Sequence, residues 1–194
     1  QFYSLKKVIR LIFGITSNDS PVIIKQKIDK YIYYFNLSSL SYAIPLVGAM
    51  IGVDYENESV FDIENPYEKK ELLFNSLYKL IIMRASKNPL VLIFEDAEWI
   101  DSNTFDFINY FINKKAKNVF LIIVSIKRIF ISNLVNRIEL KLLDKEAALN
   151  FIDAYPFVKN IPYEIKNKIY ETTGGNPYYI TELLLSLQAK GPQS

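Results

Sequence analysis

An apolar run that ends in two adjacent acids constrains the fold of this chain more than any other feature. Leu90 to Phe94 is a continuous stretch of branched and aromatic side chains, and Glu95 and Asp96 follow it directly. A short run of this kind predicts a buried strand in a sheet, with both carboxylates at its carboxyl end. Open α/β sheets bind their ligands at that edge. The sequence therefore predicts a candidate site where this strand ends.

A second apolar run, Val119 to Ser125, indicates that the sheet is parallel. Between the two runs, Asp101 to Asn113 carries an apolar stripe at helical spacing, formed by Phe105, Ile108, Phe111 and Ile112. A strand, a helix and a second strand in this order form a βαβ unit, whose strands run parallel. Arg137 to Leu142 alternates as a third strand would. We therefore expect an α/β fold with a partial parallel sheet of three recognisable strands and flanking helices.

Helices are expected on both sides of these strands. Apolar spacing predicts them at Phe2 to Gly14, Ser20 to Phe35 and Glu68 to Ser86, with shorter helices between Leu37 and Ile51. Later helices are expected at Asp144 to Ala154, where Asp144 is the N-cap, at Pro162 to Thr172, and from Asn176 onward. We interpret residues 1–142 as a partial core with a helical insertion over about residues 1–87, and residues 143–194 as a C-terminal helical segment.

Composition excludes several kinds of site. The 194 residues include no cysteine and no histidine, so the chain has no disulfide, no thiolate site and no imidazole base. Basic and acidic residues number 23 and 21, and the net charge of +2 draws the chain neither to nucleic acid nor to an anionic membrane. No apolar run approaches the roughly 20 residues of a membrane helix, and no signal peptide is recognisable, so we expect a cytoplasmic protein.

Glu95 and Asp96 have two interpretations. In the functional one, one carboxylate binds hydrated Mg²⁺ and the other orients or deprotonates an attacking water. In the structural one, both acids cap the turn that follows the strand. A nucleotide site also needs a loop of the form G-x-x-x-x-G-K-[ST] to cradle phosphates, and these 194 residues contain none. Because the sequence starts at Gln1, we expect it to be a fragment.

The run Glu95-Asp96-Ala97-Glu98-Trp99-Ile100-Asp101 resembles the Walker B region of AAA/STAND-like P-loop ATPases, whose usual form is an apolar strand followed by E/D-D-x-x-W-x-D. Downstream, Thr172 to Leu184 resembles the same family's T-G-G-N-P-[FY]-[FY]-x-x-E-L-L segment. Phe2-Tyr3-Ser4-Leu5 looks like the start of the helix after the family's second strand. The resemblance covers nearly the whole chain. Relatives occur beside class III adenylate/guanylate cyclase domains, beside protein kinase domains and in LuxR-type regulators.

The resemblance implies roles for the acids. Glu95 would be the magnesium-associated acid and Asp96 the hydrolytic one. Relatives often have His or Gln where this chain has Glu98, which adds a third negative charge beside the metal site. Trp99 and Asp101 are interpreted as structural, Trp99 packing under the loop and Asp101 capping the next helix.

The resemblance also implies nucleotide contacts elsewhere. Lys127 or Arg128 lies where relatives carry a sensor residue and would contact the γ-phosphate, although a basic pair at a strand end is the plain alternative. Pro177 is a candidate adenine contact. Its structural interpretation is that Gly174 and Gly175 end one helix, Asn176 caps the next, and Pro177 fills its first turn.

The function that we expect is an ATP-binding and ATPase signalling module of a multidomain regulatory protein, a nucleotide-dependent switch that uses ATP and Mg²⁺. It would hydrolyse ATP only with a Walker A loop supplied upstream. The alternative is a non-catalytic interaction or scaffold domain with a degenerate nucleotide site. Expected partners are ATP and other domains of the same polypeptide, such as a cyclase, kinase or LuxR-type domain. Direct nucleic-acid binding is not expected, because the last helix carries little positive charge.

Overall fold

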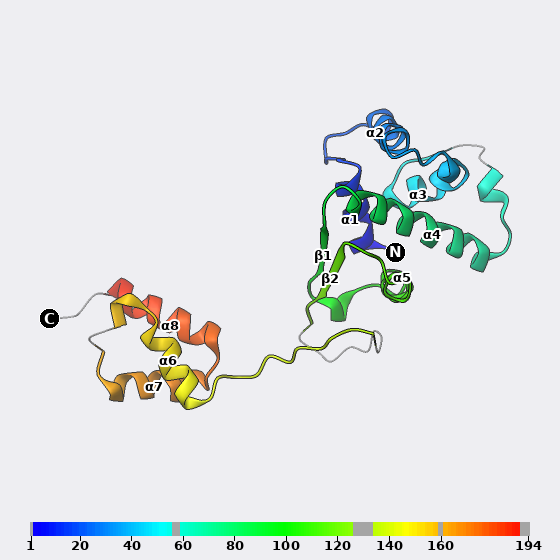
Figure 1. Cartoon of the computed structure of the whole chain (residues 1–194). Coiled ribbons are helices and arrows are strands. Elements are labelled where there is room, and N and C mark those ends of the chain that lie inside the picture. The colour runs from blue at the N-terminus through cyan, green and yellow to red at the C-terminus, as the bar shows by residue number, and fades with distance from the viewer. Residues whose placement is uncertain (1, 56–58, 126–133, 159–160, 191–194) are drawn as a thin grey trace. The chain divides into compact units, whose positions relative to one another are not determined.

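The computed structural model describes residues 2–55, 59–125, 134–158 and 161–190, and the chain divides into two compact units, residues 1–135 and 136–194. The elements of the first unit are α1 (Tyr3–Ile12), α2 (Pro21–Tyr34), η1 (Ser38–Ala43), α3 (Ile44–Ile51), η2 (Ser59–Asp62), α4 (Pro66–Ala85), β1 (Leu90–Phe94), η3 (Ala97–Trp99), α5 (Ser102–Asn113) and β2 (Val119–Ile123). The elements of the second unit are α6 (Lys145–Asp153), η4 (Pro156–Val158), α7 (Tyr163–Thr173) and α8 (Pro177–Lys190) (Figure 1).

The expected α/β fold with a three-stranded sheet is wrong. The structure is 65% helical, and the sheet in the described residues consists of two parallel strands, β1 and β2. Arg137 to Leu142 is described throughout and forms no strand, and Ile138 and Leu140 within it are 85% and 92% exposed. The physical reason is that a strand needs a neighbour to bond its backbone N–H and C=O groups, and side-chain alternation alone supplies none.

The βαβ unit itself is confirmed. β1 and β2 pair in parallel with Leu90 opposite Val119 and Phe94 opposite Ile123, and α5 connects them. One face of the sheet faces α5 and α1, since Leu92 and Phe94 are buried in the same core cluster as Leu5 and Ile108. That core extends to α4 and α3, which contact α1, and to α2, which contacts η1 and buries Ile24, Ile28 and Tyr31.

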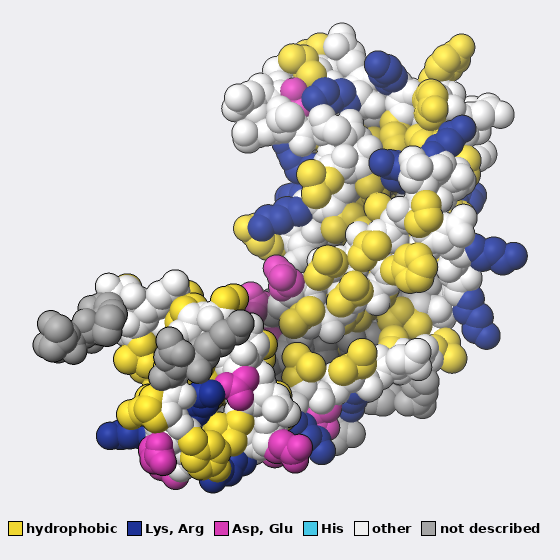
Figure 2. Space-filling model, turned by 60° about the vertical axis from the view of Figure 1, so that its left-hand side comes forward, with side chains coloured by type: hydrophobic (Ala, Val, Ile, Leu, Met, Phe, Trp, Pro, Cys, Tyr) yellow, Lys and Arg dark blue, Asp and Glu magenta, His cyan; other side chains and the backbone are white. Residues whose placement is uncertain are grey.

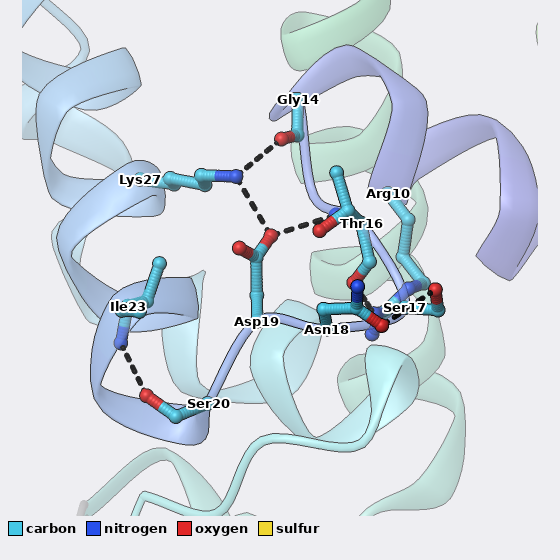
Figure 3. Close-up of polar contacts among 9 residues, drawn as sticks. All are labelled: Arg10, Gly14, Thr16, Ser17, Asn18, Asp19, Ser20, Ile23 and Lys27. Carbon is cyan, nitrogen blue, oxygen red and sulfur yellow. Dashed lines mark hydrogen bonds and ion pairs between the residues drawn. The ribbon is translucent and has the colours of Figure 1, made fainter.

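Polar contacts fix the turn between α1 and α2 (Figure 3). The Lys27 ammonium donates to the Gly14 carbonyl at 2.6 Å and pairs with the Asp19 carboxylate at 2.7 Å. Asp19 also accepts from the Thr16 backbone N–H at 2.7 Å. The hydrogen bond from Lys27, followed by that from Thr16, lowers the pKa of Asp19. The turn is therefore closed by side chains, and the Ser20 hydroxyl then caps α2 at the Ile23 N–H.

The second unit has a core of its own, formed where α6, α7 and α8 meet. Its buried side chains are Ala148, Ile152, Val158, Ile169, Ile180 and Leu184. The Asp144 carboxylate accepts from the Ala147 N–H at 2.8 Å, which confirms the predicted cap of α6. No helix in the described ranges is both long enough and apolar enough to cross a membrane.

Candidate functional site

The candidate site lies at the carboxyl end of β1, where Glu95 and Asp96 are both exposed. Backbone bonds hold this segment beside the end of β2: the Val124 N–H donates to the Phe94 carbonyl, and the Ala97 N–H donates to the Val124 carbonyl, each at 2.9 Å. The carboxyl ends of the two parallel strands therefore stay together past the last residue of β1, and both acids leave the sheet at the edge where open α/β sheets bind ligands.

Asp96 turns the chain at this point. Its backbone is left-handed, with φ 50° and ψ 44°, a conformation that Asp tolerates better than most residues. The Asp96 side chain makes no capping bond to η3, so the interpretation of this acid as a cap is not supported. In the part of the chain that the structure describes, Glu95 and Asp96 also form no ion pair, and both side chains are exposed.

Glu98 points to the second strand. The Ser125 hydroxyl, just after β2, donates to a Glu98 carboxylate oxygen at 2.8 Å. This contact connects the segment after β1 with the segment after β2. Glu98 is also the residue at which this chain departs from the resembled Walker B pattern. Ser125 is a site residue that sequence reasoning did not single out, although its position directly after the apolar run was a usable signal.

Asp101 has the predicted capping role and a second one. Its carboxylate accepts from the Thr104 N–H at 3.2 Å and from the Thr104 hydroxyl at 2.8 Å, which confirms the cap of α5. It also accepts from the backbone N–H groups of Phe2 at 2.9 Å and Tyr3 at 3.1 Å, at the start of α1. Burial opposes the charged form of Asp101, but these hydrogen bonds outweigh burial, and its pKa lies below the usual value.

Trp99 does not pack under the loop as expected. The side chain is 79% exposed, although the adjacent Ala97 is buried. As the single tryptophan of the chain, Trp99 is an intrinsic fluorescent reporter two residues before Asp101 and three after Asp96.

The remaining predicted contacts fall elsewhere. Lys127 and Arg128 lie outside the described residues. Pro177 is the first residue of α8 in the second unit, where Gly174 and Gly175 have φ of +59° and +75° and the Asn176 side chain accepts from the Tyr178 N–H at 3.0 Å. The structural interpretation of this turn is thus confirmed. The residues brought together at the first unit's strand ends are Glu95, Asp96, Glu98 and Ser125.

The acids fit a magnesium ion that is shared with a ligand better than one held by protein alone. Among the described residues, no three acidic side chains converge into a metal-binding group. Mg²⁺ commonly takes one or two carboxylates together with waters and substrate phosphates. Glu95 and Asp96 supply that number of carboxylates, whereas the loop that would hold the phosphates is not in the sequence.

Comparisons with protein-family models, with curated proteins and with solved structures found no match. The interpretation of the site therefore rests on its own residues and geometry.

Proposed function

We propose that this chain contributes the hydrolytic edge of an ATP-binding module in a multidomain regulatory protein. The observation that carries the proposal is the pair of exposed carboxylates, Glu95 and Asp96, directly at the carboxyl end of a parallel strand. Parallel strands present ligand-binding groups at this end. The resemblance of the Glu95 to Asp101 run to a Walker B region supports the choice of a nucleotide.

Each acid has a distinct role in this proposal. Glu95 would hold Mg²⁺ together with waters and the phosphates of ATP, and Asp96 would orient the attacking water and accept its proton. The bound metal would offset the negative charge of the phosphates. Glu98, which accepts a hydrogen bond from the Ser125 hydroxyl after β2, stays next to these acids.

Further contacts would be needed outside this strand end. The resemblance implies that Lys127 or Arg128 would contact the γ-phosphate, and hydrolysis would also require a phosphate-binding loop with backbone amides and a lysine, which residues 1–194 do not contain. Hydrolysis depends on that loop. Nucleotide binding would then switch the arrangement of other domains of the same polypeptide, such as a cyclase, kinase or LuxR-type domain, in the cytoplasm.

A second candidate function is a non-catalytic interaction module. The observation that favours it is a row of exposed apolar side chains on one face of the two-stranded sheet, including Val91 and Phe120. Large exposed apolar patches mark interaction surfaces. In this alternative Glu95 and Asp96 keep their positions without performing hydrolysis.

Binding of ATP with Mg²⁺ separates the two functions. The measurement is Trp99 fluorescence during titration of a polypeptide extended upstream of Gln1 to include a phosphate-binding loop. If the chain binds a nucleotide as proposed, ATP with Mg²⁺ should change Trp99 fluorescence saturably. The apparent affinity for ATP should fall at least several-fold in Glu95→Gln. A matched control is Asp29→Asn, which changes an exposed acid of α2 and should leave the titration unaltered. Absence of saturable binding would favour the interaction module.

A further inference from the structure

A hollow in the surface of the first unit lies where α2 and α4 end, and we call it the helix-end hollow. Its volume is about 350 Å³, within the roughly 300–1,000 Å³ that is typical of small-molecule sites. Its lining comes mainly from the ends of these two helices and includes Tyr31, Tyr34, Phe35, Arg84, Lys87 and Asn88. Because Asn88 precedes β1, the hollow lies at the amino end of that strand, whereas the two acids of the candidate site follow its carboxyl end.

Arg84 and Lys87 give the helix-end hollow a positive charge. Among the described residues, no acidic side chain lines the hollow, and neither of these bases forms an ion pair. Arg84 is half-buried and lies near Tyr31: burial raises the pKa of the Tyr31 hydroxyl, and the charge of Arg84 opposes that rise. Basic side chains are scattered over the face of the first unit that Figure 2 shows, so the place of this pair in a hollow is what distinguishes it. A half-buried cation without an acidic partner gains from an anion that enters beside it.

The end of α4 offers these cations a structural role, because the carboxyl end of a helix attracts positive charge. The last carbonyls of α4 nevertheless have other hydrogen-bond donors. The N–H and the hydroxyl of Ser86 donate to the carbonyls of Ile82 and Met83, at 2.9 and 2.7 Å. The Lys87 N–H donates to the Arg84 carbonyl at 3.4 Å. The side chains of Arg84 and Lys87 are therefore not needed to bond these carbonyls.

Aromatic rings of α2 supply an apolar wall of the hollow. The rings of Tyr31 and Phe35 have centroids 4.6 Å apart, and the Tyr34 ring packs edge-to-face against Phe35 at 4.9 Å. The buried Tyr31 hydroxyl donates to the Leu80 carbonyl at 2.8 Å, which connects α2 to α4. The Lys87 ammonium lies 5.5 Å from the centre of the Tyr34 ring. The hollow thus combines aromatic surface with positive charge from the facing helix end.

We propose that the helix-end hollow binds a small ligand in which a planar ring carries a carboxylate or a phosphate group. The Arg84 guanidinium donates to the anionic group, whose geometry matches its planar fork, and Lys87 adds a second positive charge. The ring of the ligand packs against Tyr34 and Phe35. This proposal does not depend on the proposed ATP site, since the two sites share no residue.

Two-dimensional NMR of the 194-residue chain during titration with benzoate and with phenyl phosphate tests the proposal. At least one of these anions should saturably shift the amide signals at the ends of α2 and α4, and the tighter one identifies the group that the ligand carries. Arg84→Gln should weaken this binding about tenfold, because a charge-assisted hydrogen bond is lost. Lys79→Gln is the matched control, since it removes a positive charge from α4 at a residue that does not line the hollow.

The aromatic wall has its own pair of variants. Tyr34→Ser keeps both charges and should weaken binding several-fold, whereas Tyr33→Ser changes an 89% exposed tyrosine outside the lining and should have no effect. Tyr34 is itself 66% exposed, so this pair remains informative if Arg84→Gln disturbs the fold. Benzamide has the shape of benzoate without its charge and should bind much more weakly. The proposal would be overturned by equal binding of benzamide and benzoate, by equal effects of Arg84→Gln and Lys79→Gln, or by no saturable shift with either anion.

Discussion

At the residue scale, Asp101 joins parts of the chain that are far apart in sequence. The carboxylate caps α5 and also accepts from the first backbone N–H groups of α1, which have no partner within their own helix. The cap was predictable because Asp101 immediately precedes the helical pattern. The contact with Phe2 was not predictable, because a long-range hydrogen bond leaves no local pattern in the sequence.

Removal of this carboxylate should destabilise the first unit. Asp101→Ala eliminates the cap of α5 and the anchor of α1, and we expect the free energy of unfolding to fall by about 1–2 kcal/mol. Urea unfolding followed by circular dichroism measures the change. The exposed residue Asp29 provides the control, and Asp29→Ala should alter the free energy by less than about 0.5 kcal/mol. Equal losses in the two variants would argue against the anchoring role.

The contribution of Asp101 should also depend on pH. Its pKa is lower in the folded chain than in the unfolded chain, because the hydrogen bonds outweigh burial. The charged form therefore stabilises the fold fully above the unfolded value of about 3.9, and this stabilisation is lost as pH falls through the lower folded value. The difference in urea midpoint between the unchanged chain and Asp101→Ala should be constant near neutral pH and shrink in acid. A difference that grows in acid would contradict this assignment.

At the element scale, the turn between α7 and α8 is held by backbone geometry. The Leu143 N–H donates to the Gly175 carbonyl at 2.9 Å, and a Cβ at Gly175 would lie 2.0 Å from the Leu143 carbonyl oxygen. Gly174 has a similar left-handed backbone, but a Cβ there meets no atom within 4 Å. A substitution at Gly174 therefore tests the left-handed backbone alone, whereas a substitution at Gly175 tests the left-handed backbone together with close packing.

Gly175→Ala should cost the second unit more than Gly174→Ala. The left-handed backbone alone costs roughly 1–2 kcal/mol for a residue with a Cβ, and we expect about that loss at Gly174. Gly175→Ala adds a displacement of the segment at Leu143, so its loss should exceed that of Gly174→Ala by at least about 1 kcal/mol. Hydrogen exchange of the α6 and α8 amides measures both. Equal losses of protection in Gly174→Ala and Gly175→Ala would show that the segment at Leu143 moves to accommodate the new Cβ without a measurable cost.

The same scale shows where sequence patterns suffice. β1, β2 and α5 were predicted because apolar runs and a helical stripe are local signals, and the structure confirms them. Arg137 to Leu142 has the alternation of a strand, but no strand lies beside it in the described ranges, so the alternation leaves Leu140 exposed. Alternation identifies a possible face and does not provide a pairing partner.

At the scale of the whole molecule, the continuous apolar run of Leu90 to Phe94 predicted a buried strand. The structure covers one face of the sheet and exposes alternate side chains on the other. The local prediction of β1 and β2 was therefore correct, while their environment depends on what else packs against them. The same holds for the candidate site. The position of Glu95 and Asp96 at the end of a strand was predicted from local sequence, whereas the contact between Glu98 and Ser125 depends on how the two strand ends meet.

ATP hydrolysis is the most direct test of the central claim, that Glu95 and Asp96 form a hydrolytic edge. The measurement is phosphate release by a polypeptide that includes residues 1–194 and a phosphate-binding loop, compared with its Asp96→Asn and Asp29→Asn variants. We expect Asp96→Asn to bind ATP with Mg²⁺ but to hydrolyse it at least about 100-fold more slowly, because the water loses its base, while hydrolysis by Asp29→Asn should be unchanged. Equal hydrolysis in Asp96→Asn and the unchanged polypeptide would contradict the claim.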